Sequence, residues 1–326
     1  MGFRYSCLFE TEWQEAQVDL TSWWRPQPSR IPVGKMGYKR SVTLAGPRME
    51  CEIYPVFGRA DEMKARAAKA NLTPEKQRKL NLRRSEEHLV RLLDTNFTEK
   101  DVHVTLTYRG DPPTYEEAYR DMRNYILKLK RYRKKMGMED LKYIYNIEGG
   151  RDARTGYALQ RMHIHMVTNG GMNREDLEAI WEKGYANCDR LQPNERGLEE
   201  LGKYIIKQHE QGKRWCASRN LKQPKRRASD VRTSNSYVKR MAYDMQAVAK
   251  EQMERLYPSY QYVECKVFYS DIVDGVYIKV LMRKKETGNG AAGKKNKRQK
   301  RMGGEAERGL LPEVLQRGNE TGGRRV

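Results

Sequence analysis

The clearest alternation of hydrophobic and polar positions lies in residues 161–167, Arg-Met-His-Ile-His-Met-Val, and it predicts a β-strand. Successive side chains of a strand point to opposite faces, so the apolar residues share one face and His163 and His165 share the other. The rise of ~3.3 Å per residue places the two imidazoles about 7 Å apart along the strand. Two rings at that spacing can converge on one metal ion, while the apolar face can pack under helices.

Other segments of the chain follow the period of a strand or that of a helix. Alternation with period two predicts strands, and apolar residues three or four positions apart predict helices. Strands are expected at residues 102–108, 141–148 and about 185–191, and hairpins at 41–57 and 262–282. Helices are expected at residues 61–93, with a start signal at Thr73 and Pro74, at 114–136, at 173–181, from 197 onward, and at 236–256.

The strand at 141–148 ends at two glycines, and the loop that follows leads directly into the histidine strand. The two strands can therefore pair as an antiparallel hairpin, which places Glu148 near the histidines and makes it a candidate third ligand. Two histidines and one carboxylate leave metal positions open for substrate oxygens. His103, in the strand at 102–108, is expected to be structural or exposed rather than a further ligand.

The helix that starts near residue 197 carries a tyrosine and a lysine at helical spacing, a pattern that a half-buried helix tyrosine without a catalytic role also explains. Leu198, Leu201 and Ile205 form its apolar stripe, and Tyr204 borders that stripe. Lys207 follows Tyr204 at i+3, so both side chains can face the same cleft.

The charge balance points to a polyanionic partner. The 326 residues include 64 Lys+Arg and 43 Asp+Glu, a formal net charge of +21, and nucleic acid is the commonest partner of such a surplus. A membrane is not expected, because no apolar run approaches the ~20 residues of a spanning helix. The acidic residues near the N-terminus argue against a secretory signal, and five cysteines without a Cys-x-x-Cys pair argue for a reducing compartment and against structural zinc.

Two basic segments are candidates for DNA contact. Cations interleaved with aromatic rings suit single-stranded nucleic acid, because phosphates meet the charges and bases stack on the rings. The alternative for the first segment is a solvated helix end whose cations oppose the helix dipole. The candidates are Lys130, Arg131, Arg133 and Lys134 around Tyr132, and Trp215, Arg219, Lys222 and Lys225 in the stretch 214–227.

Four segments are predicted from these patterns. From residue 284 onward Gly, Lys and Arg dominate and apolar periodicity vanishes, so this tail is expected to be disordered and to add sequence-independent DNA affinity. The segments are an N-terminal extension with loop and short hairpin at 1–60, a central domain with a leading basic helix at 61–228, a helix and β-hairpin at 229–283, and the tail at 284–326.

The order of these motifs resembles that of HUH endonucleases that initiate rolling-circle replication. The resemblance rests on a strand at 104–108, a strand ending at Glu148, His163-Ile164-His165, and Tyr204 followed by Lys207, and it covers roughly residues 75–225. The chain is most similar to replication-associated proteins of phages and plasmids of Gram-positive bacteria. This resemblance implies an α+β fold, a ferredoxin-like domain with a central antiparallel sheet.

The resemblance also implies a reaction. His163, His165 and Glu148 would hold Mg²⁺ or Mn²⁺, and Tyr204 would attack a phosphodiester of single-stranded origin DNA. The products would be a 5′-phosphotyrosine and a free 3′-OH that primes replication, with Lys207 stabilising the charge that develops. Position 208 is Gln, so the enzyme would have a single tyrosine, and strand closure would need a second subunit or another nucleophile.

Two other functions stay open at this point. A relaxase or transposase of the HUH class would use related chemistry, although Tyr5 lacks the neighbours that a relaxase nucleophile has. A non-catalytic basic DNA-binding protein would bind DNA without a covalent product. Because the chain contains no Walker-type phosphate loop, a fused helicase is not expected, and unwinding is assigned to a host helicase. A host polymerase is expected to carry out synthesis. The expected location, without an export signal, is the cytoplasm of a bacterial host.

Overall fold

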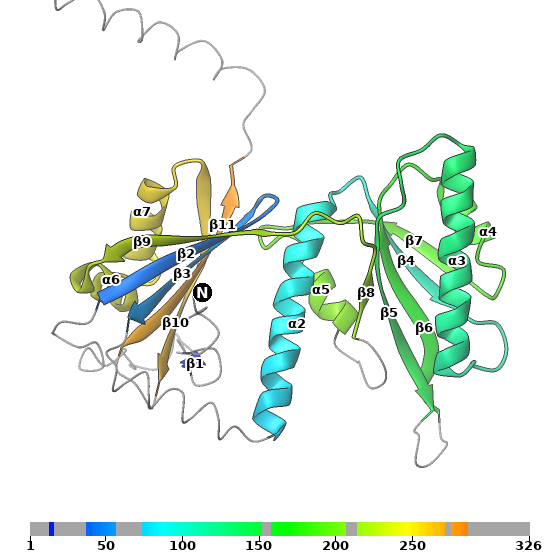
Figure 1. The fold of residues 1–326 in the computed structure, drawn as a ribbon, viewed down its shortest axis with the longest axis horizontal. Coiled ribbons are helices and arrows are strands. Elements are labelled where there is room, and N and C mark those ends of the chain that lie inside the picture. The colour runs from blue at the N-terminus through cyan, green and yellow to red at the C-terminus, as the bar shows by residue number, and fades with distance from the viewer. Residues whose placement is uncertain are drawn as a thin grey trace, which may run out of the picture. The chain divides into compact units, whose positions relative to one another are not determined.

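Two antiparallel sheets and six helices make up the part of the chain that the computed structural model describes, namely residues 13–15, 37–56, 74–151, 158–206, 214–270 and 275–285 (Figure 1). This architecture confirms the predicted α+β class. The elements in chain order are β1 (Trp13–Glu15), β2 (Gly37–Ala45), β3 (Arg48–Val56), α2 (Pro74–Asn96), β4 (Val102–Thr107), α3 (Tyr115–Lys135), β5 (Tyr143–Arg151), β6 (Ala158–Thr168), α4 (Arg174–Ala179), β7 (Ala186–Arg190), α5 (Glu199–Ile206), β8 (Cys216–Ala217), β9 (Lys225–Thr233), α6 (Asn235–Tyr243), α7 (Ala247–Leu256), β10 (Tyr260–Ser270) and β11 (Val276–Lys284).

The histidine strand β6 lies at the centre of a five-stranded sheet with the order β7-β4-β6-β5-β8. Its apolar side chains, Met162, Ile164 and Met166, are fully buried in a core that α3 completes on one face of the sheet, as the alternation predicted. On the other face, Ile144 and Val167 pack with apolar residues of α2 and α5. The two histidines therefore lie on the face that α2 and α5 partly cover.

Helix α3 begins where the sequence predicts. The Thr114 hydroxyl accepts a hydrogen bond from the backbone N–H of Glu117, and the Glu117 carboxylate accepts one from the backbone N–H of Thr114. This reciprocal cap satisfies donors that have no partner inside the helix. Further along, the Tyr125 hydroxyl donates to the Leu177 carbonyl, which ties α3 to α4.

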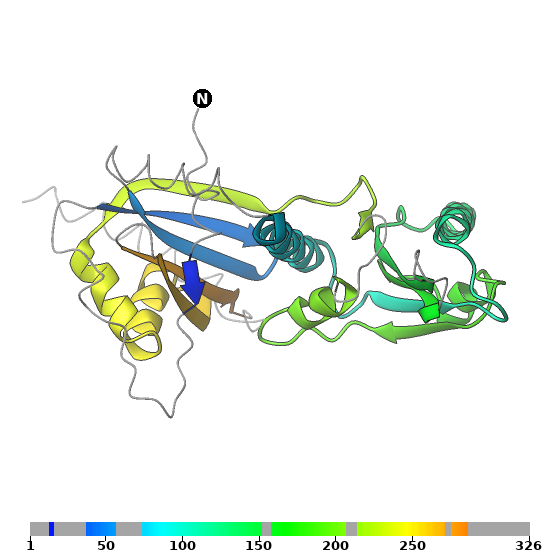
Figure 2. The same cartoon turned by 90° about the horizontal axis from the view of Figure 1, so that it is seen from below.

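A second sheet has six strands in the order β1-β10-β11-β3-β2-β9. The predicted hairpins are present as β2–β3 and β10–β11, and β11 pairs with β3, which joins them into one sheet. Helices α6 and α7 cover one face of it, and their apolar residues share a core with the strands (Figure 2). The sequence predicts the hairpins but not this pairing between distant segments.

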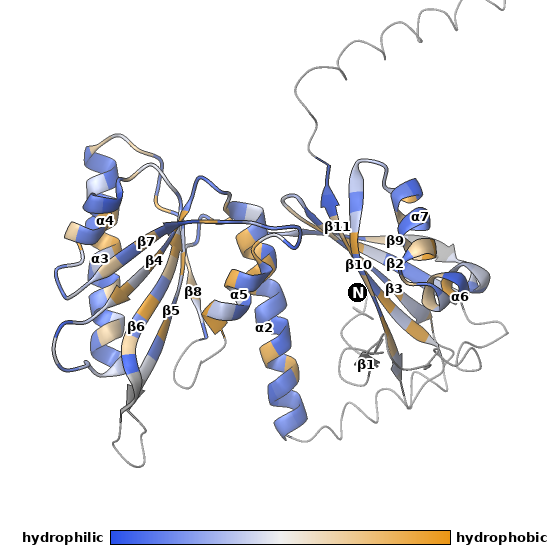
Figure 3. Cartoon of the chain, turned by 180° about the vertical axis from the view of Figure 1, so that it is seen from behind, coloured by the Kyte–Doolittle hydropathy of each residue, from blue (hydrophilic) through white to orange (hydrophobic). Residues whose placement is uncertain are grey.

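Helix α2 has an apolar side and a charged side. Leu89, Leu92 and Leu93 pack in the core shared with α5, whereas Glu87 and Arg91 make ion pairs with residues of β3 and β11. Figure 3 shows hydrophilic colour over much of α2 and hydrophobic colour on α5. The helix begins at Pro74, at the predicted start signal, and residues 61–73 of the expected helix lie outside the described residues.

One expected helix is divided in two. The segment predicted as a single helix at 236–256 forms α6 and α7, because the Asp244 carboxylate accepts hydrogen bonds from the backbone N–H groups of Gln246 and Ala247. A side chain that bonds to nearby backbone in this way competes with helix continuation. The tail at 286–326 lies outside the described residues.

Candidate active site

The pairing of β5 with β6 brings a carboxylate opposite a histidine. Glu148 is the direct partner of His163, and Asn146 is the direct partner of His165. Because directly paired residues of a sheet share a face, these four side chains lie on the same side. Glu148, His163 and His165 form a group whose potential ligand atoms lie within 4.8 Å of one another, and such a group can hold a metal ion.

The carboxylate lies between the two rings. Glu148 Oε2 is 3.3 Å from His163 Nε2 and 3.9 Å from His165 Nε2. His165 and Glu148 are 1% and 5% exposed, and His163 is half-buried. One side of the group is therefore accessible through His163 while the other two ligands are held inside the protein.

The hydrogen bonds of the rings leave both Nε2 atoms for coordination. His163 Nδ1 lies 2.9 Å from the Arg161 carbonyl, which can only accept, so Nδ1 carries the proton. In the neutral ring, His163 Nε2 then directs a lone pair at Glu148 Oε2. Because both atoms are hydrogen-bond acceptors, a proton or a cation must lie between them. His165 Nδ1 contacts His103 Nε2 at 3.2 Å and Thr105 Oγ1 at 3.3 Å.

His165 Nε2 gives a direct test of whether a metal fits. This atom is buried and has no hydrogen-bond partner among the described residues, although a buried polar atom without a partner is costly. A metal-bound histidine commonly has its other ring nitrogen fixed by a neighbouring group, as Nδ1 of this ring is. The donor set of two imidazoles and one carboxylate thus fits a divalent cation.

The protonation of the rings follows from their surroundings. Burial, with smaller contributions from the neighbouring His103 and His163, lowers the pKa of His165 to about 3, so this ring is neutral at physiological pH. The pKa of His163 is raised, chiefly by its hydrogen bond to Glu148, against the opposing effect of burial. Burial also lowers the pKa of His103. Because His165 is neutral, a metal ion at this site would have to displace only one proton, the proton on Nε2 of His163.

Tyr204 lies beside this group, as predicted. Its ring centroid is 4.9 Å from that of His165 and 6.4 Å from that of His103, and the tyrosine is 54% exposed. Its neighbours Ile205 and Ile206 are buried in the core shared with α2, so α5 is anchored while Tyr204 faces outward beside the histidines. Lys207, the predicted partner of Tyr204, lies outside the described residues.

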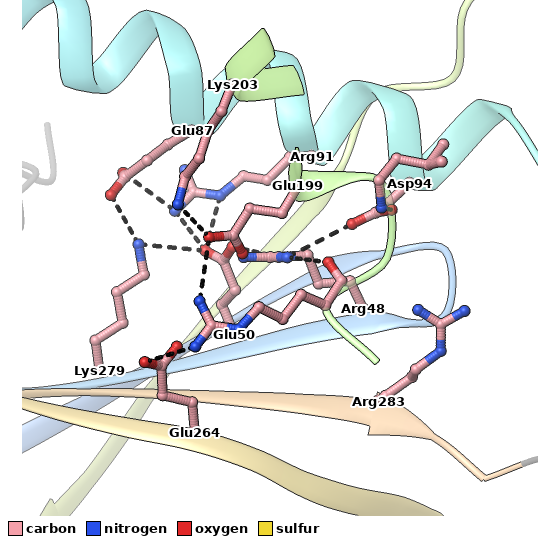
Figure 4. A network of polar contacts seen from close by, with 12 residues as sticks. Arg48, Glu50, Glu87, Arg91, Asp94, Glu199, Lys203, Glu264, Lys279 and Arg283 are labelled. Atoms are coloured by element: carbon pink, nitrogen blue, oxygen red, sulfur yellow. Dashed lines mark hydrogen bonds and ion pairs between the residues drawn. The ribbon is translucent and has the colours of Figure 1, made fainter. Parts of the chain in front are cut away.

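The start of α5 is fixed by a network of polar contacts with α2 and β3 (Figure 4). Asp94 Oδ1 accepts a hydrogen bond from the backbone N–H of Leu198 at 2.8 Å. Gly197 has a positive φ of 72°, and a Cβ there would overlap the Asp94 carboxylate, so the close approach requires glycine. Arg48 donates to the Arg196 carbonyl at 2.9 Å and to Glu199 at 3.1 Å.

One residue of the site was not predicted. Asn146 bonds Glu148, and its position two residues earlier on the same strand face is a signal that could have revealed it. His103 stacks on His165 with ring centroids 5.3 Å apart, which agrees with a structural place for its ring. Its alternation with Thr105 in β4 already places it on the histidine face once β4 is paired with β6.

The predicted DNA contacts on α3 are divided by burial. Lys130, Arg131 and Lys134 are exposed, on the helix that covers the face of the sheet opposite the histidines. Arg133 was expected to contact DNA, and the structure contradicts this. It is 3% exposed, and its guanidinium donates to the carbonyls of Glu139, Asn169 and Gly170. Its guanidinium therefore stabilises backbone carbonyls of the protein itself.

The second basic segment lies beside α2. Trp215 is half-buried: its Nε1–H donates to Ser85 Oγ at 3.0 Å, and its ring packs against the core shared by α2 and α5. Arg219, Lys222 and Lys225 are exposed and remain candidates for phosphate contact.

Comparisons with known proteins give one match. Residues 101–209 match the family model described as Replication-associated protein ORF2/G2P, and this range contains Glu148, His163, His165 and Tyr204. Searches of curated proteins and of solved structures gave no match. The family match supports a replication initiator of the Rep type with DNA as its partner. None of the helices that the structure describes combines the length and apolar character needed to cross a membrane.

Proposed function

We propose that the chain is an HUH endonuclease that nicks single-stranded DNA at a replication origin and so initiates rolling-circle replication. The observation that carries this proposal is the position of Tyr204, whose exposed ring lies 4.9 Å from His165 at the edge of the Glu148–His163–His165 group. A nucleophile next to a set of metal ligands is the arrangement that tyrosine attack on a phosphodiester needs.

Glu148, His163 and His165 would hold Mg²⁺ or Mn²⁺. When bound there, the cation would neutralise charge on a non-bridging phosphate oxygen and orient the phosphate for in-line attack. Burial of His165 keeps that ring neutral and its lone pair available, and the Arg161 carbonyl fixes the His163 tautomer. These side chains therefore set the ligand geometry before DNA arrives.

Tyr204 carries the covalent step. Its phenolic oxygen forms a bond to phosphorus while the bond from phosphorus to the 3′ oxygen breaks, and the phenol proton passes to water as the 3′ oxygen gains one. The product is a 5′-phosphotyrosine and a free 3′-OH. The exchange of one phosphoester for another conserves the bond for later religation. Lys207 would stabilise the developing negative charge.

The DNA strand would be held by exposed cations. Lys130, Arg131, Lys134, Arg219, Lys222 and Lys225 are the proposed phosphate contacts. A single tyrosine per chain implies a second subunit or another nucleophile for strand closure. A host helicase and polymerase in a bacterial cytoplasm would supply unwinding and synthesis for a phage or plasmid replicon.

A denaturing gel tests the proposal. The purified chain is incubated with overlapping single-stranded oligonucleotides that cover the replicon encoding it, in Mn²⁺ or in EDTA. We expect a slower-migrating covalent adduct that needs Mn²⁺ and is absent from Tyr204→Phe. Tyr243→Phe is the matched control, because Tyr243 is 60% exposed and lies on α6 of the other sheet.

The possible results separate the alternatives. DNA binding without any adduct, unchanged by EDTA and by Tyr204→Phe, would favour a non-catalytic DNA-binding protein. An adduct that persists in Tyr204→Phe would keep the reaction class but reject this nucleophile.

A further inference from the structure

Asn146 lies between the candidate metal ligands and the helix that carries Tyr204. It is 1% exposed, stands two residues before Glu148 in β5 and pairs directly with His165 in β6. Its side-chain Nδ2 donates to Glu148 Oε1 at 2.9 Å and also to the backbone carbonyl of Ile205 in α5.

The orientation of this amide is forced by its partners. A carboxylate oxygen and a backbone carbonyl can only accept hydrogen bonds, so the group that faces both must be the NH₂ of Asn146. Both of its hydrogens are then used. Its Oδ1 is buried without a hydrogen-bond partner among the described residues, which lowers the stability of the folded state.

Each of the two bonds has a consequence for the site. The bond to Glu148 engages Oε1, which leaves Oε2 as the oxygen that faces both histidines. The bond to Ile205 ties the Asn146 side chain to the backbone of α5. Ile205 is the residue after Tyr204, so the same amide holds one metal ligand and the backbone beside the nucleophile.

We propose that Asn146 is a positioning residue that sets the distance between the metal ligand Glu148 and the Tyr204 helix. This inference rests on the proposed function and deepens it. Groups that hold metal ligands in place typically change metal affinity or activity 10- to 100-fold when they are lost. A residue with a purely structural role would lower stability and leave metal affinity unchanged.

The test compares two buried asparagines, Asn146 in β5 and Asn169 directly after β6. Asn169 is 8% exposed, and its side chain also makes two hydrogen bonds, to the backbone of Lys142 and Asp140, away from the histidine pair. Mn²⁺ affinity of the full chain without DNA is measured by isothermal titration calorimetry, together with the melting temperature. The rate of adduct formation is then measured at saturating Mn²⁺.

We expect Asn146→Ala to raise the Kd for Mn²⁺ about 10- to 100-fold and to slow adduct formation even at saturating Mn²⁺. Asn169→Ala should lower the melting temperature comparably and leave both other quantities at the wild-type values. Asn146→Ser, which keeps one donor, should give a smaller rise in Kd, and it decides the question if Asn146→Ala does not fold.

Two failures are distinguishable. A wild-type chain that binds Mn²⁺, with the same Kd in the folded Asn146 variants, would overturn the role of Asn146 alone. A wild-type chain that binds no Mn²⁺ and forms no adduct would overturn the proposed function and this inference with it.

Discussion

The guanidinium of Arg48 in β3 lies 3.1 Å from the carboxylate of Glu199, the first residue of the helix that carries Tyr204. Arg48 also pairs with Glu50 at 2.7 Å and with Asp94 at 3.6 Å. The six-stranded sheet is therefore bonded through one side chain to both α2 and α5. Arg48 is 8% exposed, and it shares Glu50 with Arg91 and Glu199 with Lys203 in one network of ion pairs.

Replacement of Arg48 by Met should destabilise the protein by about 3–5 kcal/mol, because three acidic side chains would lose a buried partner. Urea unfolding followed by circular dichroism measures this. Lys79→Ala is the control, since the Glu75–Lys79 pair is about three-quarters exposed on both sides and should contribute at most about 1 kcal/mol. Equal effects of the two substitutions would show that the Arg48 network adds nothing beyond a surface pair.

Asp94 should give stability a distinctive pH dependence. Burial raises its pKa from 3.8 to about 6, against the lowering effects of the Leu198 N–H and Arg48. Between these values the folded state binds more protons than the unfolded state, so the contribution of Asp94 to the free energy of unfolding falls as pH rises. The free energy of unfolding of the wild type minus that of Asp94→Asn should therefore fall by on the order of 3 kcal/mol as the pH rises from 4 to 7. A difference that is flat or rises with pH would contradict the assignment.

Loss of both histidines should separate cleavage from binding. We expect the double substitution His163→Ala and His165→Ala to abolish the adduct and Mn²⁺ binding while salt-sensitive DNA binding persists, because phosphate contacts come from other residues. Fluorescence anisotropy at several salt concentrations measures the binding. His88→Ala is the matched control, because His88 lies on α2 with its ring centroid 5.6 Å from that of Trp215, and its loss should leave metal binding intact. An equal loss of DNA binding would mean that the pair is structural.

Mn²⁺ affinity should rise with pH around neutrality. The Glu148 hydrogen bond raises the pKa of His163 above 6.5, and a protonated ring cannot coordinate through Nε2. Without metal, the same shift stabilises the folded state below pH 6.5, and this contribution is lost as pH rises through the folded pKa. Calorimetry in buffers of different ionisation enthalpy should show release of up to one proton per Mn²⁺ bound. Affinity that falls with rising pH would contradict this protonation.

Arg133 and Lys134 are neighbours with opposite expected roles. Arg133→Ala should lower stability by about 1–3 kcal/mol through lost hydrogen bonds to buried carbonyls, with no change in the salt dependence of DNA binding. Lys134→Ala should leave stability unchanged and lower the salt slope by ~1 if Lys134 contacts a phosphate. Anisotropy titrations and thermal unfolding of both variants distinguish the two. The reverse pattern would return Arg133 to the DNA surface.

Local patterns were sufficient for the elements near the site. Alternation in β6 predicted both the buried methionines and the shared face of His163 and His165, because side-chain direction in a strand depends only on the position in the sequence. The start of α3 at the Thr114 cap was equally local. By contrast, the end of α6 at Asp244 depends on a side-chain bond that competes with helix periodicity, and periodicity alone predicted one continuous helix.

Periodicity could not predict which of the basic residues of α3 are buried. Arg133 lies in a run of cations, and its neighbours Lys134 and Arg131 are exposed, so no sequence pattern separates it from them. The structure buries it because backbone carbonyls converge there from Glu139, six residues away, and from Asn169 and Gly170, 36 and 37 residues away. A guanidinium with several planar donors can satisfy such a set, which a helix pattern does not reveal.

The sequence by itself determined where strands and helices form near the site, because these follow from short periods. The order of its motifs, through the resemblance it carries, indicated the α+β class, the candidate ligands and the candidate nucleophile. Only the tertiary structure decided that Glu148 pairs with His163, that Asn146 bonds both Glu148 and α5, and that distant hairpins form one sheet. Strand register and the pairing of distant segments depend on how whole elements pack. Many residues share that packing free energy, so no local pattern encodes it.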